Sequence, residues 1–111
     1  MELIETSVFT RQIAALLSDD EYHQFQSRIA ANPSLGAVIK GGGGIRKIRV
    51  AAKSKGKSGG ARVIYYWAVR KDVILLLFAY AKNESADLTQ KQVSELARTV
   101  KKEFGSEAEN V

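Results

Sequence analysis

Apolar residues near the N-terminus recur with the spacing of an α-helix. Two stripes have this spacing, the first formed by Phe9, Ile13, Leu16 and Leu17 and the second by Tyr22, Phe25 and Ile29. Between them, Ser18 and Glu21 form a capping-box pattern, which marks the start of a helix. These patterns predict a short opening strand within residues 3–9 and two consecutive helices within residues 8–31.

From residue 45 onward the pattern changes and predicts strands. Ile48 and Val50 alternate with Lys47 and Arg49, as in a strand with one buried face. Residues 62–69 are rich in β-branched and aromatic residues, which predicts a hairpin partner for that strand. Residues 73–81 contain no charged side chain, which predicts a central strand covered on both faces.

The last predicted element is an amphipathic helix. Its start is marked by Asp87 or Thr89, either of which can cap a helix, and Thr89 forms a second capping box with Gln92. Its apolar stripe consists of Val93, Leu96, Ala97, Val100 and Phe104. The residues at the end, 105–111, are acidic and are predicted to form a frayed tail.

The order of elements predicts an α+β fold, β-α-α-β-β-β-α, in a single domain of residues 1–111. Short connections join the three later strands, so we expect a small, twisted and mainly antiparallel sheet. We expect the helices to pack on one face of this sheet. The other face is then available to Lys47 and Arg49, with Arg62 and Tyr66 as further candidates.

Composition excludes several classes of protein. With 45% hydrophobic and 26% charged residues the chain is a folded domain, and without cysteine it has neither disulfides nor a cysteine metal site. The N-terminus lacks the basic and apolar regions of a signal peptide. The apolar run at residues 73–81 is far shorter than the roughly 20 residues of a membrane helix. We therefore expect a cytoplasmic protein without a membrane partner.

Positive charge is concentrated in the middle of the chain. Residues 22–71 contain eleven Lys and Arg and no Asp or Glu, although the whole chain carries a net charge of only +5. Because these cations lie within and between predicted strands, their positions are fixed by the sheet. The segment therefore predicts a rigid surface that binds a polyanion.

The strand pattern places the strongest candidates together. Lys47 and Arg49 are two residues apart, so they share one side of a strand at a spacing of about 6.5 Å, and Arg62 begins the adjacent strand. Three converging cations suit a phosphate group, although a solvated basic strand face has the same pattern. The Lys53, Lys55 and Lys57 loop is suited to contact a nucleic-acid backbone.

Other catalytic constellations are missing from the sequence. His23 is the single histidine and is predicted to lie on the surface of a helix, so neither a Ser-His-Asp set nor metal-ligand spacing is present. The glycine-rich stretches do not match a nucleotide-binding P-loop. We expect no metal and no cofactor, and any chemistry must rest on Lys, Arg and Tyr. Tyr80 and Lys82, on one side of the last strand, are either a stacking ring with a cation or a core tyrosine with a solvated lysine.

Several segments together resemble the RelE-type toxins of the RelE/ParE superfamily, from bacterial type II toxin–antitoxin modules, and most closely their HigB-like branch. The segments are residues 35–39, 43–51, 55–57, 59–66, 80–84 and 87–89. The resemblance spans about residues 8–104, and residues 46–66 are its most specific part.

This resemblance implies a toxin that binds the ribosomal A site and cleaves mRNA without a metal. In the implied reaction the RNA 2′-hydroxyl attacks the adjacent phosphate and expels the 5′-oxygen, so the substrate supplies the nucleophile. The implied catalytic residues are Lys47, Arg49, Arg62 and Lys82, with Tyr80 as a further candidate for stacking or proton transfer. The residues expected to bind RNA are Arg46, Lys53, Lys55, Lys57 and Tyr66.

The chain departs from the family pattern at two places. Asn83 stands where many relatives have an arginine, and residues 88–90 contain no tyrosine where many relatives have one. Tyr80 and Tyr66 are the candidates to replace it. These departures leave two alternatives open, a non-catalytic toxin on the same scaffold of the kind that inhibits DNA gyrase and an inactive RNA-binding module.

The resemblance also implies partners. They are the ribosome, mRNA and a cognate antitoxin of the helix-turn-helix type that covers the basic face. Operator DNA is expected to be reached only through that antitoxin.

Overall fold

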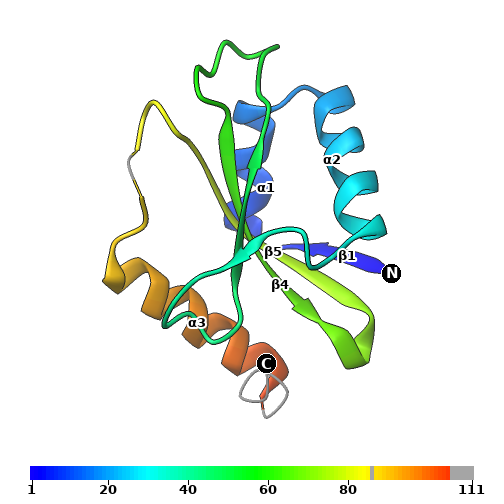
Figure 1. Ribbon diagram of the computed structural model, residues 1–111, viewed down its shortest axis with the longest axis vertical. Coiled ribbons are helices and arrows are strands. Elements are labelled where there is room, and N and C mark those ends of the chain that lie inside the picture. The colour runs from blue at the N-terminus through cyan, green and yellow to red at the C-terminus, as the bar shows by residue number, and fades with distance from the viewer. Residues whose placement is uncertain (86, 106–111) are drawn as a thin grey trace.

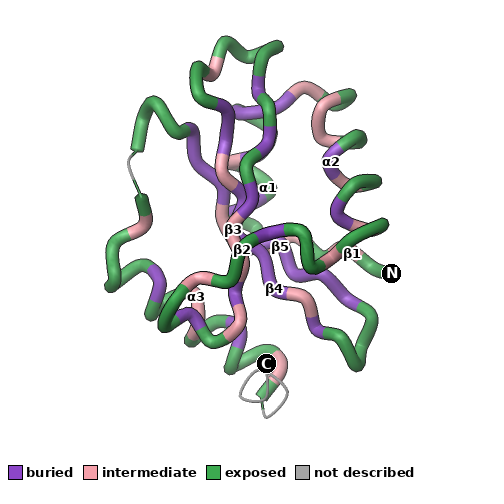
Figure 2. The backbone as a smooth tube through the Cα atoms, in the orientation of Figure 1, coloured by how far each residue is buried: buried purple, intermediate pink, exposed green. Residues whose placement is uncertain are grey.

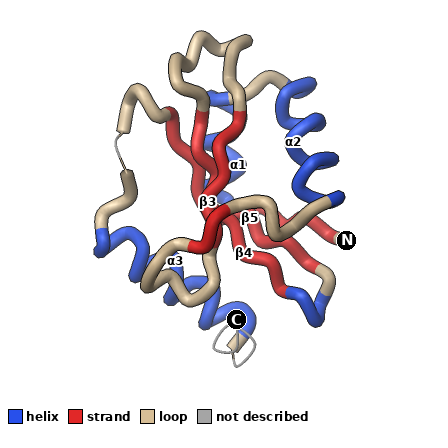
Figure 3. The backbone as a smooth tube through the Cα atoms, in the orientation of Figure 1, coloured by secondary structure: helices blue, strands red, loops and turns tan. Residues whose placement is uncertain are grey.

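A computed structural model describes residues 1–85 and 87–105, so most of the predicted frayed tail lies outside the described residues. Within these residues the chain forms three α-helices, one short 3-10 helix and a five-stranded sheet (Figures 1 and 3). In chain order the elements are β1 (Glu2–Glu5), α1 (Ser7–Leu16), α2 (Asp19–Ala31), β2 (Ala37–Val38), β3 (Arg46–Val50), β4 (Ala61–Ala68), η1 (Val69–Lys71), β5 (Val73–Ala81) and α3 (Gln90–Phe104). The predicted α+β class and order are confirmed, with β2 as an unpredicted addition.

The sheet has the strand order β1-β5-β4-β3-β2. β1 is parallel to β5, and the other neighbouring pairs are antiparallel. The predicted opening strand was too long, because the Thr6 side chain accepts a hydrogen bond from the Phe9 backbone N–H at 3.1 Å and starts α1 directly after β1. The capping boxes of Ser18 and Thr89 form as predicted at the starts of α2 and α3.

Two apolar cores lie on opposite faces of the sheet. Phe9 and Phe25, from α1 and α2, pack against one face, whereas Val93 and Val100 of α3 pack against the other. Figure 1 shows α3 on the side of the sheet away from α2. The expectation that all helices share one face was therefore wrong. A strand that is apolar on both faces requires a cover on each, and α3 provides the second cover.

Strand β5 lies between β1 and β4 and is buried along almost its whole length, as predicted (Figure 2). Its pairing with β4 shifts in register, since Tyr65 is opposite Leu76 and Ile64 is opposite Phe78. Leu77 is therefore the extra residue of a β-bulge. Leu75 faces α3 before the bulge, Leu77 faces α3 at the bulge, and Tyr80 faces the same side after it.

The buried Tyr65 side chain ties the α2–β2 connection to the sheet. Its hydroxyl donates to the Pro33 carbonyl oxygen at 2.7 Å and accepts from the Gly36 N–H at 2.8 Å. A Cβ atom at position 36 would lie 2.8 Å from a carbon of the Tyr65 ring, so glycine is needed for this approach. None of the described helices is both long and apolar enough to cross a bilayer.

Replacing Tyr65 tests this connection. The Tyr65→Phe variant removes both hydrogen bonds and leaves the Pro33 carbonyl and the Gly36 N–H without the hydroxyl. We expect the free energy of unfolding to fall by about 1–3 kcal/mol in urea denaturation. The matched control is Tyr80→Phe, because the buried Tyr80 hydroxyl has no hydrogen-bond partner among the described residues. An equal loss in both variants would contradict this role of Tyr65.

Candidate polyanion-binding site

The strand register aligns three candidate residues across the sheet. Arg49 of β3 is opposite Arg62 of β4, and Arg62 is opposite Tyr80 of β5. Lys47 lies two residues before Arg49 and therefore on the same face. This face is the one that α3 covers farther along β4, at Tyr66 and Ala68. The cations thus occupy the part of the face that α3 does not cover.

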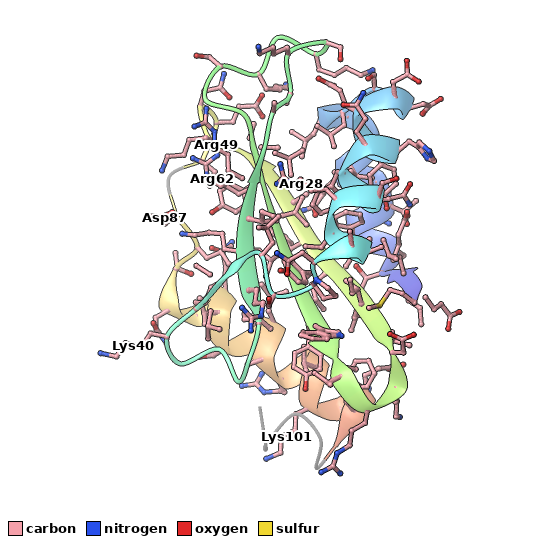
Figure 4. The ribbon with its side chains drawn as sticks, turned by 45° about the vertical axis from the view of Figure 1, so that its right-hand side comes forward. Arg28, Lys40, Arg49, Arg62, Asp87 and Lys101 are labelled. Carbon is pink, nitrogen blue, oxygen red and sulfur yellow. The ribbon has the colours of Figure 1, made fainter. Side chains whose placement is uncertain are left out.

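The two arginines differ in how they are held. The Arg62 Nη1 atom donates to the carbonyl oxygens of Gly59 and Ala61, at 3.0 and 3.3 Å. Arg49 is exposed, and its backbone carbonyl accepts a hydrogen bond of 3.0 Å from Arg28 of α2. Among the described residues neither Arg49 nor Arg62 forms an ion pair with a carboxylate. Figure 4 shows the two side chains close together, far from Lys40 and Lys101.

The lysines of this face, in contrast, have carboxylate partners. The Asp87 carboxylate lies 3.3 Å from Lys47 Nζ and 3.9 Å from Lys82 Nζ. The Lys47 hydrogen bond, together with the positive charges of Lys47 and Lys82, lowers the pKa of Asp87. Glu84 pairs with Lys57 at 2.7 Å. The segment after β5 therefore places two carboxylates among the cations.

The predicted basic loop connects β3 to β4. With the adjacent strand ends it borders an open hollow of about 330 Å³, whose charged lining residues are Arg49, Lys53 and Lys57. Lys55 is exposed and, among the described residues, its side chain has no recorded hydrogen bond or ion pair. The loop therefore presents cations beside the arginine pair.

Glu21 of α2 anchors the base of this loop. Its carboxylate accepts hydrogen bonds from the backbone N–H groups of Ser18, at 3.0 Å, and Ser54, at 3.2 Å. The Ser54 hydroxyl also donates to the Ser18 hydroxyl at 3.1 Å. Hydrogen bonds from Ser54 and Ser18 lower the pKa of Glu21 from 4.5 to about 2. The capping box of α2 thus has a second role as the attachment point of the loop.

Tyr80 lies in the row of arginines but is largely buried, with 8% of its surface exposed. Burial, followed by the negative charge of Asp87, raises the pKa of its hydroxyl, whereas Arg62 opposes the shift. The phenol therefore keeps its proton at neutral pH and can act as a hydrogen-bond donor.

Two residues expected to bind RNA do not belong to this surface. Tyr66 is fully buried beneath α3 and packs against Phe104, with ring centroids 5.4 Å apart. Arg46 alternates with Lys47 to the opposite face, where its Nη1 donates to the Ser34 and Gly36 carbonyls at 3.1 and 2.8 Å. The structure instead adds Asp87 and Glu84, which sequence reasoning did not assign to the site. The capping-residue pattern was the one signal at Asp87.

The residues present suit a polyanion rather than a metal ion. Among residues 1–85 and 87–105, no group of three or more His, Cys, Asp or Glu could hold a metal. Rows of arginine and lysine on a rigid sheet can instead bind phosphate oxygens.

The model of the family described as the RelE toxin of the RelE/RelB toxin–antitoxin system matches residues 5–111. The chain therefore belongs to the RelE toxin family, and membership implies a cognate antitoxin as a partner.

A solved structure agrees with this fold. The structure of the E. coli toxin RelE in the free state, with two arginines replaced by alanine, is 17% identical and has a TM-score of 0.54. The match covers 89% of this chain and 95% of that chain. At this identity the likeness shows the fold alone.

The anchoring carboxylate predicts a defined pH dependence. Because the pKa of Glu21 is lower in the folded protein, its stabilising effect is present above its unfolded value and is lost as pH falls from 4.5 toward 2. In urea unfolding, the difference in stability between the parent and Glu21→Gln is expected to shrink over this range. The matched control is Glu95→Gln, since the Glu95 side chain has no partner among the described residues. The same pH trend in both variants would show that the hydrogen bonds of the Glu21 carboxylate do not stabilise the fold.

Proposed function

We propose that this chain is a ribosome-dependent mRNA endoribonuclease that inhibits translation. The single observation that carries this proposal is the row formed by Arg49, Arg62 and Tyr80 on three neighbouring strands, with Lys47 and Lys82 beside it. Membership of a toxin family and the cationic surface both support it. The reaction is metal-free transesterification, in which the RNA 2′-hydroxyl attacks the adjacent phosphate and the 5′-oxygen leaves.

In this mechanism the arginine pair binds the scissile phosphate. Arg49 and Arg62 have no carboxylate partner among the described residues, so their guanidinium groups can donate to phosphate oxygens. Negative charge increases on those oxygens in the transition state, and fixed donors stabilise it more than they stabilise the ground state. Lys47 and Lys82 flank the row, and their ammonium groups are the candidates to move protons. Tyr80, opposite Arg62, is a further candidate for stacking or proton transfer.

The surrounding cations would position the protein on the ribosome. Lys53 and Lys55 are exposed on the loop next to the arginine pair, where they can contact the rRNA backbone without reading sequence. We propose that the antitoxin is a helix-turn-helix protein that covers this face, and that operator DNA is reached only through it.

Mapping mRNA 5′ ends after expression of the chain in cells tests this function. Cuts in phase with codons on translated messages are the expected result. DNA breaks without RNA cleavage would instead identify a gyrase-type toxin, and neither change would identify an RNA-binding module.

A single substitution tests the arginine row. Arg62→Ala is expected to abolish growth arrest and to reduce mRNA cleavage by about 10²-fold or more, because it removes a donor to the phosphate. Arg11→Ala on the exposed surface of α1 is the matched control. Circular dichroism and urea unfolding check that both variants fold. Full toxicity of a folded Arg62→Ala variant would exclude this residue from the site.

The basic loop predicts an effect on binding rather than on chemistry. Lys55→Ala is expected to weaken ribosome binding modestly and to reduce the dependence of log affinity on log salt by about 0.7–0.9, as for one lost phosphate contact. Sedimentation of ribosomes with the chain at several salt concentrations measures this slope. The cleavage rate of ribosome-bound mRNA is expected to stay close to that of the parent. A large fall in that rate would place Lys55 in the reaction itself.

A further inference from the structure

The cations of this face fall into two groups with different surroundings. Arg49 and Arg62 lack a carboxylate partner among the described residues, whereas Lys47 and Lys82 share the carboxylate of Asp87. The Asp87 side chain is 65% exposed, and those of Lys47 and Lys82 are 36% and 41% exposed. Water therefore reaches all three groups, and their contacts can be exchanged for contacts with an external anion.

The position of Asp87 is where a phosphate would be held. Its oxygen lies within 4 Å of both ammonium groups, one from β3 and one from the end of β5. Arg62 also acts electrostatically on this carboxylate, so three cations influence one anion. Figure 4 shows Asp87 on the same side of the molecule as Arg49 and Arg62. A carboxylate and a phosphodiester offer the same kind of charged oxygen acceptor.

We propose that Asp87 is an internal counter-ion of the site, which occupies the place of an RNA phosphate between Lys47 and Lys82 and is displaced when RNA binds. This inference rests on the proposed function for the identity of the polyanion. The arginines then bind the RNA backbone first. The lysines bind it only after they exchange the carboxylate for a phosphate. This exchange weakens the binding of free RNA. RNA on the ribosome is still bound tightly, because the ribosome supplies further contacts.

Removing the carboxylate charge tests this inference. The Asp87→Asn variant keeps the side-chain shape and one acceptor oxygen, but it frees two lysines from an ion pair. An exposed ion pair is worth up to about a factor of five in affinity, so the variant is expected to bind single-stranded RNA about two- to fivefold more tightly. Because the parent forms the same lysine–phosphate contacts once the carboxylate is displaced, the slope of log affinity against log salt is expected to stay close to that of the parent.

The matched control is Asp72→Asn, which changes the net charge equally at the opposite end of β5. Asp72 lies in the turn before β5, pairs with the N-terminus at 3.0 Å, and has a positive φ of 55° that asparagine tolerates. The two sites are separated by the nine residues of β5, which span far more than the screening length of about 8 Å at physiological salt. The affinity of the Asp72→Asn variant for RNA is therefore expected to match that of the parent.

The experiment measures fluorescence anisotropy of a short 2′-O-methyl oligonucleotide, which the proposed reaction cannot cleave, over a series of salt concentrations. Heparin, titrated in parallel, reports on binding of any polyanion. Tighter binding by Asp87→Asn than by Asp72→Asn, with similar slopes, supports the inference. Equal behaviour of the two variants toward both probes overturns it, even if Arg62→Ala shows that the proposed function is correct. A gain toward heparin alone supports the counter-ion but contradicts RNA as its competitor.

Discussion

Helix α3 covers only part of one sheet face, and this incomplete cover determines where a charged site can exist. Along β4, the α3 side changes from the buried Tyr66 and Ile64 to the partly exposed Arg62. A charged side chain would be costly beneath the helix, since burial of an unpaired charge is strongly unfavourable. Beyond the helix, the same rigid sheet holds cations at fixed spacing without that cost. One part of this sheet face therefore packs beneath α3 and stabilises the fold, and the other part carries the cations of the site.

The remaining part of this surface is not uniformly positive. Asp87 and Glu84 follow β5 and contact lysines, whereas the arginines are left to solvent or to backbone carbonyls. Net charge alone therefore describes the surface poorly. The cations without a carboxylate partner among the described residues are available to contact a polyanion before those that are paired with a carboxylate. The contact of Arg28 with the Arg49 carbonyl and the anchoring of Ser54 by Glu21 hold the backbone from the opposite face. Helix α2 thus supports the backbone from which the arginines and the lysines of the loop project.

The sequence allowed the fold class, the capping boxes and the common face of Lys47 and Arg49 to be predicted, because these follow from local periodicity. β2 was missed, since two residues are too few for a pattern. The amphipathic stripe of α3 does not specify which sheet face it covers. This one ambiguity caused two errors, the placement of all helices on one face and the exposure of Tyr66. Asp87 could not be assigned because its position depends on the path of the chain after β5, which local pattern does not define.

The bulge at Leu77 links the packing of α1 to the composition of the site. If the same residues of β5 paired with β4 without the bulge, the side chains beyond Leu77 would exchange faces, and Tyr80 would point toward α1 while Ala79 and Ala81 replaced it beside the arginines. The two alanines now lie in the core formed with α1, where small side chains allow the helix to approach the sheet. The bulge thus decides which side chains of β5 join the site and which join the core with α1, so a loss of the bulge at constant length would alter both layers at once.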